Sequence, residues 1–219
     1  MAESTKRLAF NAGQLVVLGF LIGNVIGTIL LMLPISSTSG SADPLTASFT
    51  SVSALSLTGL TVVDTATYWS PFGQFVIIAL IKIGGFGVMA VGSLLVLMLT
   101  QKVSFKTKLT STAEQKALGL DDFRHLLVRL FQISLAVEGT LTIILSLHFW
   151  LSYKEDLPQA IWHGIFHSIS AFNNAGFSTF EGGLLRFVQD PLVLYTVSTA
   201  AIIGGLGFPV LIELSRRLI

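Results

Sequence analysis

The chain has 219 residues, of which 52% are hydrophobic and only 11% are charged. Soluble domains carry about 25% charged residues, so this composition excludes an ordinary soluble protein and indicates a membrane protein. The formal net charge of +1 gives no reason to expect a nucleic-acid partner, and the absence of cysteine excludes a disulfide framework.

Four apolar runs are long enough to cross a bilayer, which requires about 20 mostly apolar residues. In chain order they are Leu8–Leu33, Phe72–Thr100, Leu130–Leu151 and Pro191–Leu214. The first run is longer than the apolar region of a signal peptide, so we expect it to be a retained span. The second and third runs each contain a single charged residue, Lys82 and Glu138 respectively.

Most lysine and arginine residues gather on one side of the four spans. They precede the first span, separate the second from the third, and follow the fourth: Lys6, Arg7, Lys102, Lys106, Lys108, Lys116, Arg124, Arg129, Arg216 and Arg217. The positive-inside rule therefore places both termini and the central loop in the cytoplasm. An even number of spans satisfies this orientation.

Two semi-apolar segments outside the spans, "PLTASFTSVSALSLTGLTVVDT" and "IWHGIFHSISAFNNAGFSTF", match each other. With an offset of 117 residues, Gly59 corresponds to Gly176, and the later motif "IGGFG" returns as "IGGLG" with an offset of 120. The chain is therefore predicted to contain two helix–segment–helix repeats, residues 1–110 and 111–219. Internal repeats are common in membrane transport proteins.

Each short segment must enter the membrane from the outer side and return there. Its helical part of about 13 residues would be about 20 Å long, which is too short to cross about 30 Å of hydrocarbon. A polar stretch with glycine follows, and such backbone is tolerated at membrane depth only inside protein or beside water. We therefore expect an all-α membrane protein with four transmembrane helices and two re-entrant pore segments, whose carbonyls bind a cation. The alternative is a pair of amphipathic interfacial helices with capping loops.

The glycine pairs of the two "GGxG" motifs are predicted to let the outer helices approach the pore segments closely, as small residues do in membranes. A gating hinge at these glycines is the alternative interpretation. We favour the role in packing.

The motifs "LSLTGLTVVDTATYW", "IKIGGFGVM", "FHSISAFNNAGFS" and "IIGGLGF" closely resemble the membrane subunit of Ktr-type potassium uptake systems, in the Trk/Ktr/HKT superfamily. The resemblance extends along essentially the whole chain but covers only the first two of the family's four repeats. It implies that the chain is the N-terminal half of a transporter subunit; half of a pore completed by other subunits is the alternative. It also implies sodium-stimulated potassium uptake across the plasma membrane, with no covalent cofactor and no enzymatic activity.

The resemblance further implies partners and a binding site. The partners are the lipid bilayer, a second copy of the full-length subunit, and a cytosolic ring of nucleotide-binding regulatory subunits. The basic central loop could dock this ring; the alternative is that positive-inside topology alone accounts for its charge. The potassium-binding filter, carried over residue by residue, consists of Leu57, Thr58, Gly59, Leu60, Asn174, Ala175, Gly176 and Phe177. The carbonyls of Thr58, Gly59, Ala175 and Gly176 are expected to point toward one axis.

Three residues depart from the family pattern. Leu57 supplies no hydroxyl at the innermost filter position, Pro209 should bend the fourth span, and Lys82 replaces an uncharged polar residue. Charged groups are costly at membrane depth and should not face lipid. Because Lys82 and Glu138 lie at similar depths, we expect both to face protein and to pair; separate partners for each are the alternative.

Single features of the sequence also fit functions other than coupled transport. His163 and His167 lie one helical turn apart, a spacing that can bind metal, but Gly164 stands where an intramembrane metalloprotease needs glutamate. A metalloenzyme is therefore a minor alternative to two histidines that hydrogen-bond within the pore-helix packing. An uncoupled cation channel is the other alternative, and flux measured with and without sodium would separate it from coupled uptake. A purely structural subunit has no use for two such segments.

Overall fold

The computed structural model describes residues 12–88 and 120–206 of the chain. Along the described residues the elements are α1 (Ala12–Met32), α2 (Pro44–Leu55), α3 (Thr65–Tyr68), the helix Pro71–Val88, α5 (Leu120–Ser152), α6 (Leu157–Phe172), the 3₁₀ helix η1 (Leu185–Phe187) and α7 (Pro191–Gly205). These parts of the chain contain an isolated β-bridge between Ser37 and Trp69 but no β-strand. The predicted all-α fold is therefore confirmed.

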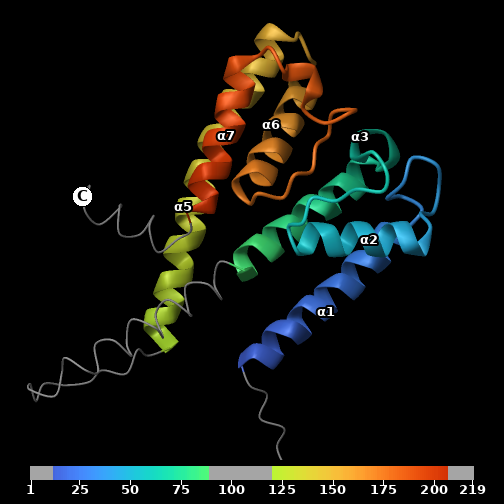
Figure 1. The fold of residues 1–219 in the computed structure, drawn as a ribbon, viewed down its shortest axis with the longest axis vertical. Helices are drawn as coiled ribbons and strands as arrows, with labels where there is room; N and C mark the ends of the chain where they lie inside the picture. The colour runs from blue at the N-terminus through green and yellow to red at the C-terminus, as the bar shows by residue number, and fades with distance from the viewer. Residues whose placement is uncertain (1–11, 89–119, 207–219) are drawn as a thin grey trace, which may run out of the picture.

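The helices form two groups that follow the predicted order of helix, short helix and helix (Figure 1). In the first group, α2 lies between α1 and the helix Pro71–Val88; in the second, α6 packs against both α5 and α7. After α2 and again after α6, the chain turns and runs back beside the short helix as non-helical backbone (Figure 1). The arrangement agrees with two copies of one unit, and the boundary at residue 110 lies outside the described residues.

Similar sequence signals start four of the helices. Asp43 and Asp190 cap α2 and α7 with their carboxylates, each followed by a proline at the first helical position. Ser70 accepts a hydrogen bond from the Gly73 N–H at the start of the helix Pro71–Val88, and Asp156 precedes α6. Proline at the first turn removes no helical hydrogen bond, so these sequences fix where each helix begins.

The helix lengths separate the spans from the short helices. Two helices, Pro71–Val88 and Val128–Ser152 within α5, are long and apolar enough to cross a membrane by length and composition. α2 has 12 residues and α6 has 16, so each is shorter than the hydrocarbon thickness of about 30 Å at 1.5 Å per residue. α1 and α7, which carry the other predicted spans, reach the edges of the described residues.

One predicted boundary differs clearly from the structure. α5 begins at Leu120, ten residues before the apolar run that starts at Leu130. The apolar run marks where a helix meets hydrocarbon, whereas the helix itself can continue into water with polar residues. Hydropathy therefore locates a membrane boundary and leaves the helix boundary open.

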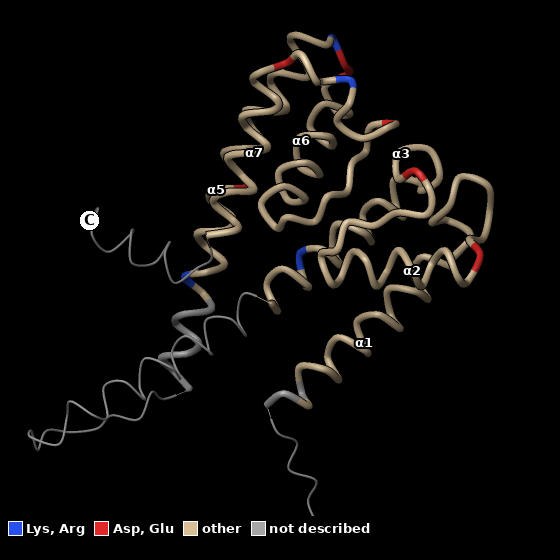
Figure 2. Tube along the Cα trace, in the orientation of Figure 1, with Lys and Arg blue, Asp and Glu red and all other residues tan. Residues whose placement is uncertain are grey.

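The charged residues concentrate at the ends of the helices (Figure 2). In the described residues, the segments that join the helices carry Asp43, Asp64, Lys154, Glu155, Asp156, Glu181, Arg186 and Asp190. Within the two candidate spans, the charged residues are Lys82, Glu138 and, next to the start of the second span, Arg129. This distribution agrees with the bilayer environment predicted from composition.

The hydrophobic core is shared between the two repeats. The largest buried cluster consists mainly of first-repeat residues but includes Phe166, Ala175 and Phe177 of the second repeat. A smaller cluster joins Leu130 and Phe172 with Phe86 of the first repeat. The repeats therefore pack as one body.

Candidate ion pathway

The first short helix ends in a turn that exposes non-helical backbone. The N–H of Leu57 donates to the carbonyl of Ala54 at 3.4 Å, and the N–H of Thr58 donates to the carbonyl of Ser53 at 3.0 Å. Leu57 has φ +59°. These two bonds around a left-handed residue are a Schellman motif, which satisfies the last helical carbonyls while it reverses the chain.

The second short helix ends in the same way. The N–H of Asn174 donates to Ala171 at 3.0 Å, the N–H of Ala175 donates to Ser170 at 2.8 Å, and Asn174 has φ +55°. Each of these residues lies 117 positions after its counterpart in the first turn. The two stretches "LTG" and "NAG" therefore adopt one backbone conformation despite different side chains.

Glycine is required two residues later in both copies. Gly59 has φ +71° and Gly176 has φ +73°, a region that side chains rarely adopt. The two glycines also face each other, because a Cβ on Gly59 would lie 2.7 Å from the Ala175 carbonyl oxygen and 3.4 Å from the Gly176 Cα. The structure thus brings the two candidate filter segments into contact.

The remaining candidate residues occupy different environments. Leu60 is 62% exposed, whereas Ala175 and Phe177 are buried. The hydroxyl of Ser170 donates to the carbonyl of Phe177 at 2.7 Å, so this carbonyl is held toward α6. The Thr58 hydroxyl donates to Ser53 Oγ at 3.0 Å, which ties the first segment to its own short helix.

The glycines of the "GGxG" motifs lie against the ends of the short helices. A Cβ on Gly84 would overlap the carbonyl oxygen of Leu55, and a Cβ on Gly204 would overlap that of Phe172. Leu55 and Phe172 are the last residues of α2 and α6. The predicted close approach of the helix Pro71–Val88 and of α7 to the two short helices at these glycines is confirmed.

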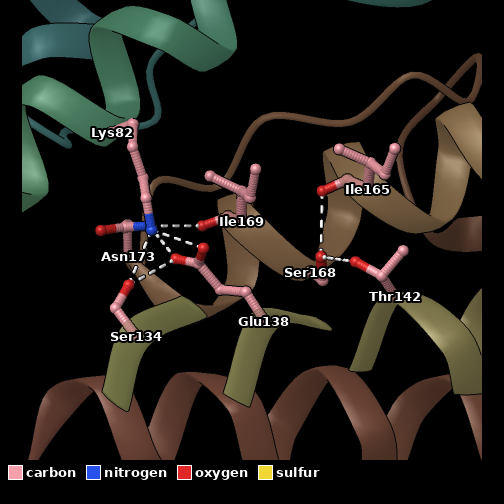
Figure 3. A network of polar contacts seen from close by, with 8 residues as sticks. All are labelled: Lys82, Ser134, Glu138, Thr142, Ile165, Ser168, Ile169 and Asn173. Carbon is pink, nitrogen blue, oxygen red and sulfur yellow. Dashed lines mark hydrogen bonds and ion pairs between the residues drawn. The ribbon is translucent and has the colours of Figure 1, made fainter. Parts of the chain in front are cut away.

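Lys82 and Glu138 meet inside the molecule. Lys82 Nζ lies 2.5 Å from Glu138 Oε2 and 2.7 Å from the Ser134 hydroxyl oxygen (Figure 3). The Glu138 side chain is 5% exposed and that of Lys82 is 27% exposed. The predicted ion pair between the repeats is confirmed, and separate satisfaction of the two charges is wrong.

The two histidines of α6 make hydrogen bonds within the fold. His163 Nδ1 lies 2.6 Å from the Thr179 hydroxyl, and His167 Nε2 lies 2.9 Å from the Ser178 hydroxyl. Among the described residues there is no group of three or more histidine or carboxylate side chains that could hold a metal ion. The histidines therefore fasten the returning chain to α6.

The polar contacts between α5 and the start of α7 were not predicted from the sequence. His148 Nε2 lies 2.6 Å from Asp190 Oδ2, and the Tyr153 hydroxyl donates to the same oxygen at 2.7 Å. Burial opposes ionisation of Asp190, but hydrogen bonds from His148, Tyr153 and the Val193 N–H outweigh it and lower the pKa of Asp190 to about 2. The "QDPL" sequence signals the helix cap, but no local pattern signals the contact with α5.

A second carboxylate lies nearby. Glu155 Oε1 is 3.5 Å from Arg186 Nη2, and the Arg186 guanidinium lies 4.7 Å from the ring centre of Phe180. Burial raises the pKa of Glu155, and the charge of Arg186 offsets part of that effect.

Two further hydrogen bonds join the repeats. Asp64 Oδ2 accepts from the Gly182 N–H at 3.0 Å, and Gln74 Oε1 accepts from Trp162 Nε1 at 2.8 Å.

The sequence matches a known protein family over almost its whole length. The sequence model of TrkH, described as a cation transport protein, matches residues 2–218. The chain belongs to the TrkH family of cation transport proteins. Membership confirms the predicted family. It also confirms the expectation of a transport protein rather than an enzyme, and it shows that this is a membrane protein.

Relatives within this family bear names that specify ions. The chain is 37% identical over 215 residues to Ktr system potassium uptake protein B of Bacillus subtilis, covering 97% of this chain and 47% of the relative. It is 34% identical over 207 residues to the protein of the same name from Vibrio alginolyticus, covering 93% of this chain and 44% of that one. It is 35% identical over 199 residues to the potassium/sodium uptake protein NtpJ of Enterococcus hirae, covering 89% and 43%. The chain spans about half the length of these relatives.

Proposed function

We propose that this chain forms two repeats of a potassium uptake pore in the plasma membrane. The observation that carries the proposal is the pair of matching turns after α2 and α6, whose glycine backbones meet. Carbonyl oxygens in such non-helical backbone can replace the hydration shell of a potassium ion. The filter would consist of the stretches from Leu57 to Leu60 and from Asn174 to Phe177, with the short helices as re-entrant pore helices.

The partial coverage of the relatives supports a pore that further repeats complete. Two segments would supply half of a ring of carbonyls, and the exposure of Thr58 and Leu60 leaves both side chains accessible to further repeats. The names of the potassium uptake relatives support potassium as the cargo. The relative named for potassium and sodium supports sodium as the stimulating ion.

The proposed assembly follows the same reasoning. Excess lysine and arginine before the first span and after the fourth support cytoplasmic termini. The word "system" in the names of the relatives supports a further regulatory component, which we propose to be a cytosolic nucleotide-binding ring beneath a homodimer of the full-length subunit.

The experiment is potassium uptake in cells that lack their own uptake systems, with the complete transporter that contains this chain. We expect uptake of potassium or rubidium to rise when the protein is expressed and to increase further when sodium is added. Equal uptake with and without sodium would identify an uncoupled cation channel. Uptake no greater than in cells with an empty vector would contradict the proposed function.

A further inference from the structure

Three helices meet at one polar cluster between the repeats. The helix Pro71–Val88 contributes Lys82, α5 contributes Ser134 and Glu138 one turn apart, and α6 contributes Asn173 at its end (Figure 3). Glu138 and Asn173 are each 4% exposed, as is Ser134. Buried polar groups of this kind are stable when every member has a partner.

The two oxygens of Glu138 have separate tasks. Oε2 lies 2.5 Å from Lys82 Nζ, whereas Oε1 accepts from the Ser134 hydroxyl at 3.0 Å and from Asn173 Nδ2 at 3.2 Å. Lys82 also donates to Ser134 at 2.7 Å. The lysine therefore sets the rotation of the carboxylate, and the carboxylate in turn orients the amide of Asn173.

Asn173 lies where that orientation matters. It is the C-cap of α6, and the next residue, Asn174, begins the turn that leads to Ala175 and Gly176. The helix that carries Lys82 holds Asn173 from a second side, because a Cβ on Gly85 would overlap its Oδ1. One helix of the first repeat thus contacts the cap of the second pore segment directly and through a carboxylate.

The bond between the end of the short helix and a buried carboxylate occurs in the second repeat and, among the described residues, has no equivalent at the end of α2. The counterpart of Asn173 in the first repeat is Ser56, which is exposed and whose hydroxyl donates to the Val52 carbonyl of its own helix at 2.6 Å. Asn173 makes the equivalent bond to Ile169 at 2.8 Å and adds the bond to Glu138.

We propose that Lys82 and Glu138 are positioning residues for the second filter segment and so determine ion selectivity. This inference rests on the proposed function. The ion pair also cancels the positive charge that Lys82 would otherwise place beside a cation pathway. Removal of one partner leaves an uncompensated charge at membrane depth, which costs far more than removal of both.

The test compares four variants of the complete transporter: Lys82→Gln, Glu138→Gln, the double variant, and Asn173→Ala. We expect each single charge variant to lower potassium-over-sodium discrimination about tenfold. The double variant should return within about threefold of the unmodified protein, because glutamine at position 138 keeps an oxygen that can accept from Asn173 and no charge is left unpaired. Asn173→Ala changes no charge, so an effect limited to electrostatics would leave its selectivity unchanged. A positioning role predicts that Asn173→Ala lowers selectivity as Glu138→Gln does, and that the two changes together add little.

The matched control is Trp162→Phe, which removes another hydrogen bond between the repeats, to Gln74, but keeps the ring. We expect its selectivity to equal that of the unmodified protein. Asn173→Ala and the double variant bury no unpaired charge, so they remain informative if a single charge variant does not fold. Unchanged selectivity in Asn173→Ala, or additive effects of the two charge changes, would overturn the proposal.

A second measurement separates this inference from the proposed function. Potassium that binds the folded protein raises its unfolding temperature, and this is measured on purified protein without any transport. Absence of uptake by the unmodified transporter would contradict the uptake function alone. The measured quantity is the unfolding temperature in potassium chloride minus the unfolding temperature in sodium chloride. We expect this difference to be smaller in both single charge variants and to be retained in the double variant. An equal rise in all of them would overturn the positioning role.

Discussion

Leu57 shows how the backbone requirements of the candidate filter outweigh local preference. A left-handed conformation costs a residue such as leucine about 1–2 kcal/mol, and glycine or asparagine normally occupies this place in the motif. Asn174 follows that preference in the second repeat. Leu57 instead packs against the main buried cluster, which offsets the strain. The conformation persists because two hydrogen bonds of the turn and the surrounding core determine it.

Replacement of Gly59 by alanine tests the contact between the candidate filter segments. The new Cβ is strained at φ +71° and lies 2.7 Å from the Ala175 carbonyl oxygen. Gly182→Ala is the matched control, because its φ is +68° and nothing lies within 4 Å of the new Cβ. We expect both variants to lose about 1–2 kcal/mol of stability from strain, but only Gly59→Ala to lose potassium-over-sodium selectivity in an uptake assay. Equal selectivity in the two variants would contradict the assignment of Gly59 to the filter.

At the scale of the elements, the small residues decide how closely the helices approach. Gly84 and Gly204 allow two outer helices to contact the last carbonyls of α2 and α6. Without side chains at these positions, van der Waals contact forms between backbones, which is a main source of helix association in a membrane. The short helices are thereby held at a fixed depth against the spans.

Gly204→Ala should therefore destabilise the protein. The added methyl group would overlap the Phe172 carbonyl, and overpacking of this kind costs about 1–3 kcal/mol or more. Gly139→Ala is the control within α5, where nothing lies within 4 Å and the higher helix propensity of alanine should add up to about 1 kcal/mol. Thermal unfolding of both purified variants in detergent measures the difference. A Gly204→Ala variant as stable as the unmodified protein would refute the packing role.

The Asp190 carboxylate at the start of α7 should make the stability of the protein fall at acid pH. The pKa of Asp190 is lowered from 3.8 to about 2, so its stabilisation is fully present above about pH 3.8 and is lost as the pH falls through about 2. We expect Asp190→Asn to be less stable at neutral pH by about 1.5–3 kcal/mol, since charge-assisted hydrogen bonds are lost, and to lose less stability on acidification. Unfolding temperatures between pH 2 and pH 6 provide the measurement. Asp43→Asn, which alters the cap of α2, should retain the acid dependence of the unmodified protein.

At the scale of the whole molecule, the two repeats share one hydrophobic core. Phe166 of α6 is fully buried in a cluster composed mostly of first-repeat residues. The loops beyond the two candidate filter segments are joined by Asp64 and Gly182. Contacts of this kind couple the positions of the two segments, because neither repeat can shift without disturbing the shared core.

Phe166→Ala should therefore destabilise both repeats together. Deletion of a fully buried phenylalanine side chain costs about 3–5 kcal/mol, whereas Phe75→Ala removes a side chain that is 56% exposed and should cost much less. We expect a single unfolding transition at a lower temperature, measured by the fluorescence of the tryptophans, with Trp69 in the first repeat and Trp150 and Trp162 in the second. Two separate transitions would show that the repeats fold independently.

Much of the candidate site could be predicted from local sequence. The matching motifs around Gly59 and Gly176 predict a duplicated turn, because only a few residue types adopt left-handed backbone. The glycines of "GGxG" predict close packing for a similar reason. The contacts of Asp190 with α5, and the bond from Trp162 to Gln74, could not be predicted. Each joins residues far apart in the chain, and no periodicity or spacing encodes such a pair.

The sequence by itself determined that this is a membrane protein and that two short segments match each other, because hydropathy and duplication act over short stretches of chain. It also indicated that Lys82 and Glu138 needed protein partners, since isolated charges are costly in hydrocarbon. Only the tertiary structure decided that Asn173 shares the Glu138 carboxylate with Lys82, and that Gly59 meets the backbone of Ala175. These contacts depend on how three helices pack around two turns, and packing is a property of the whole fold.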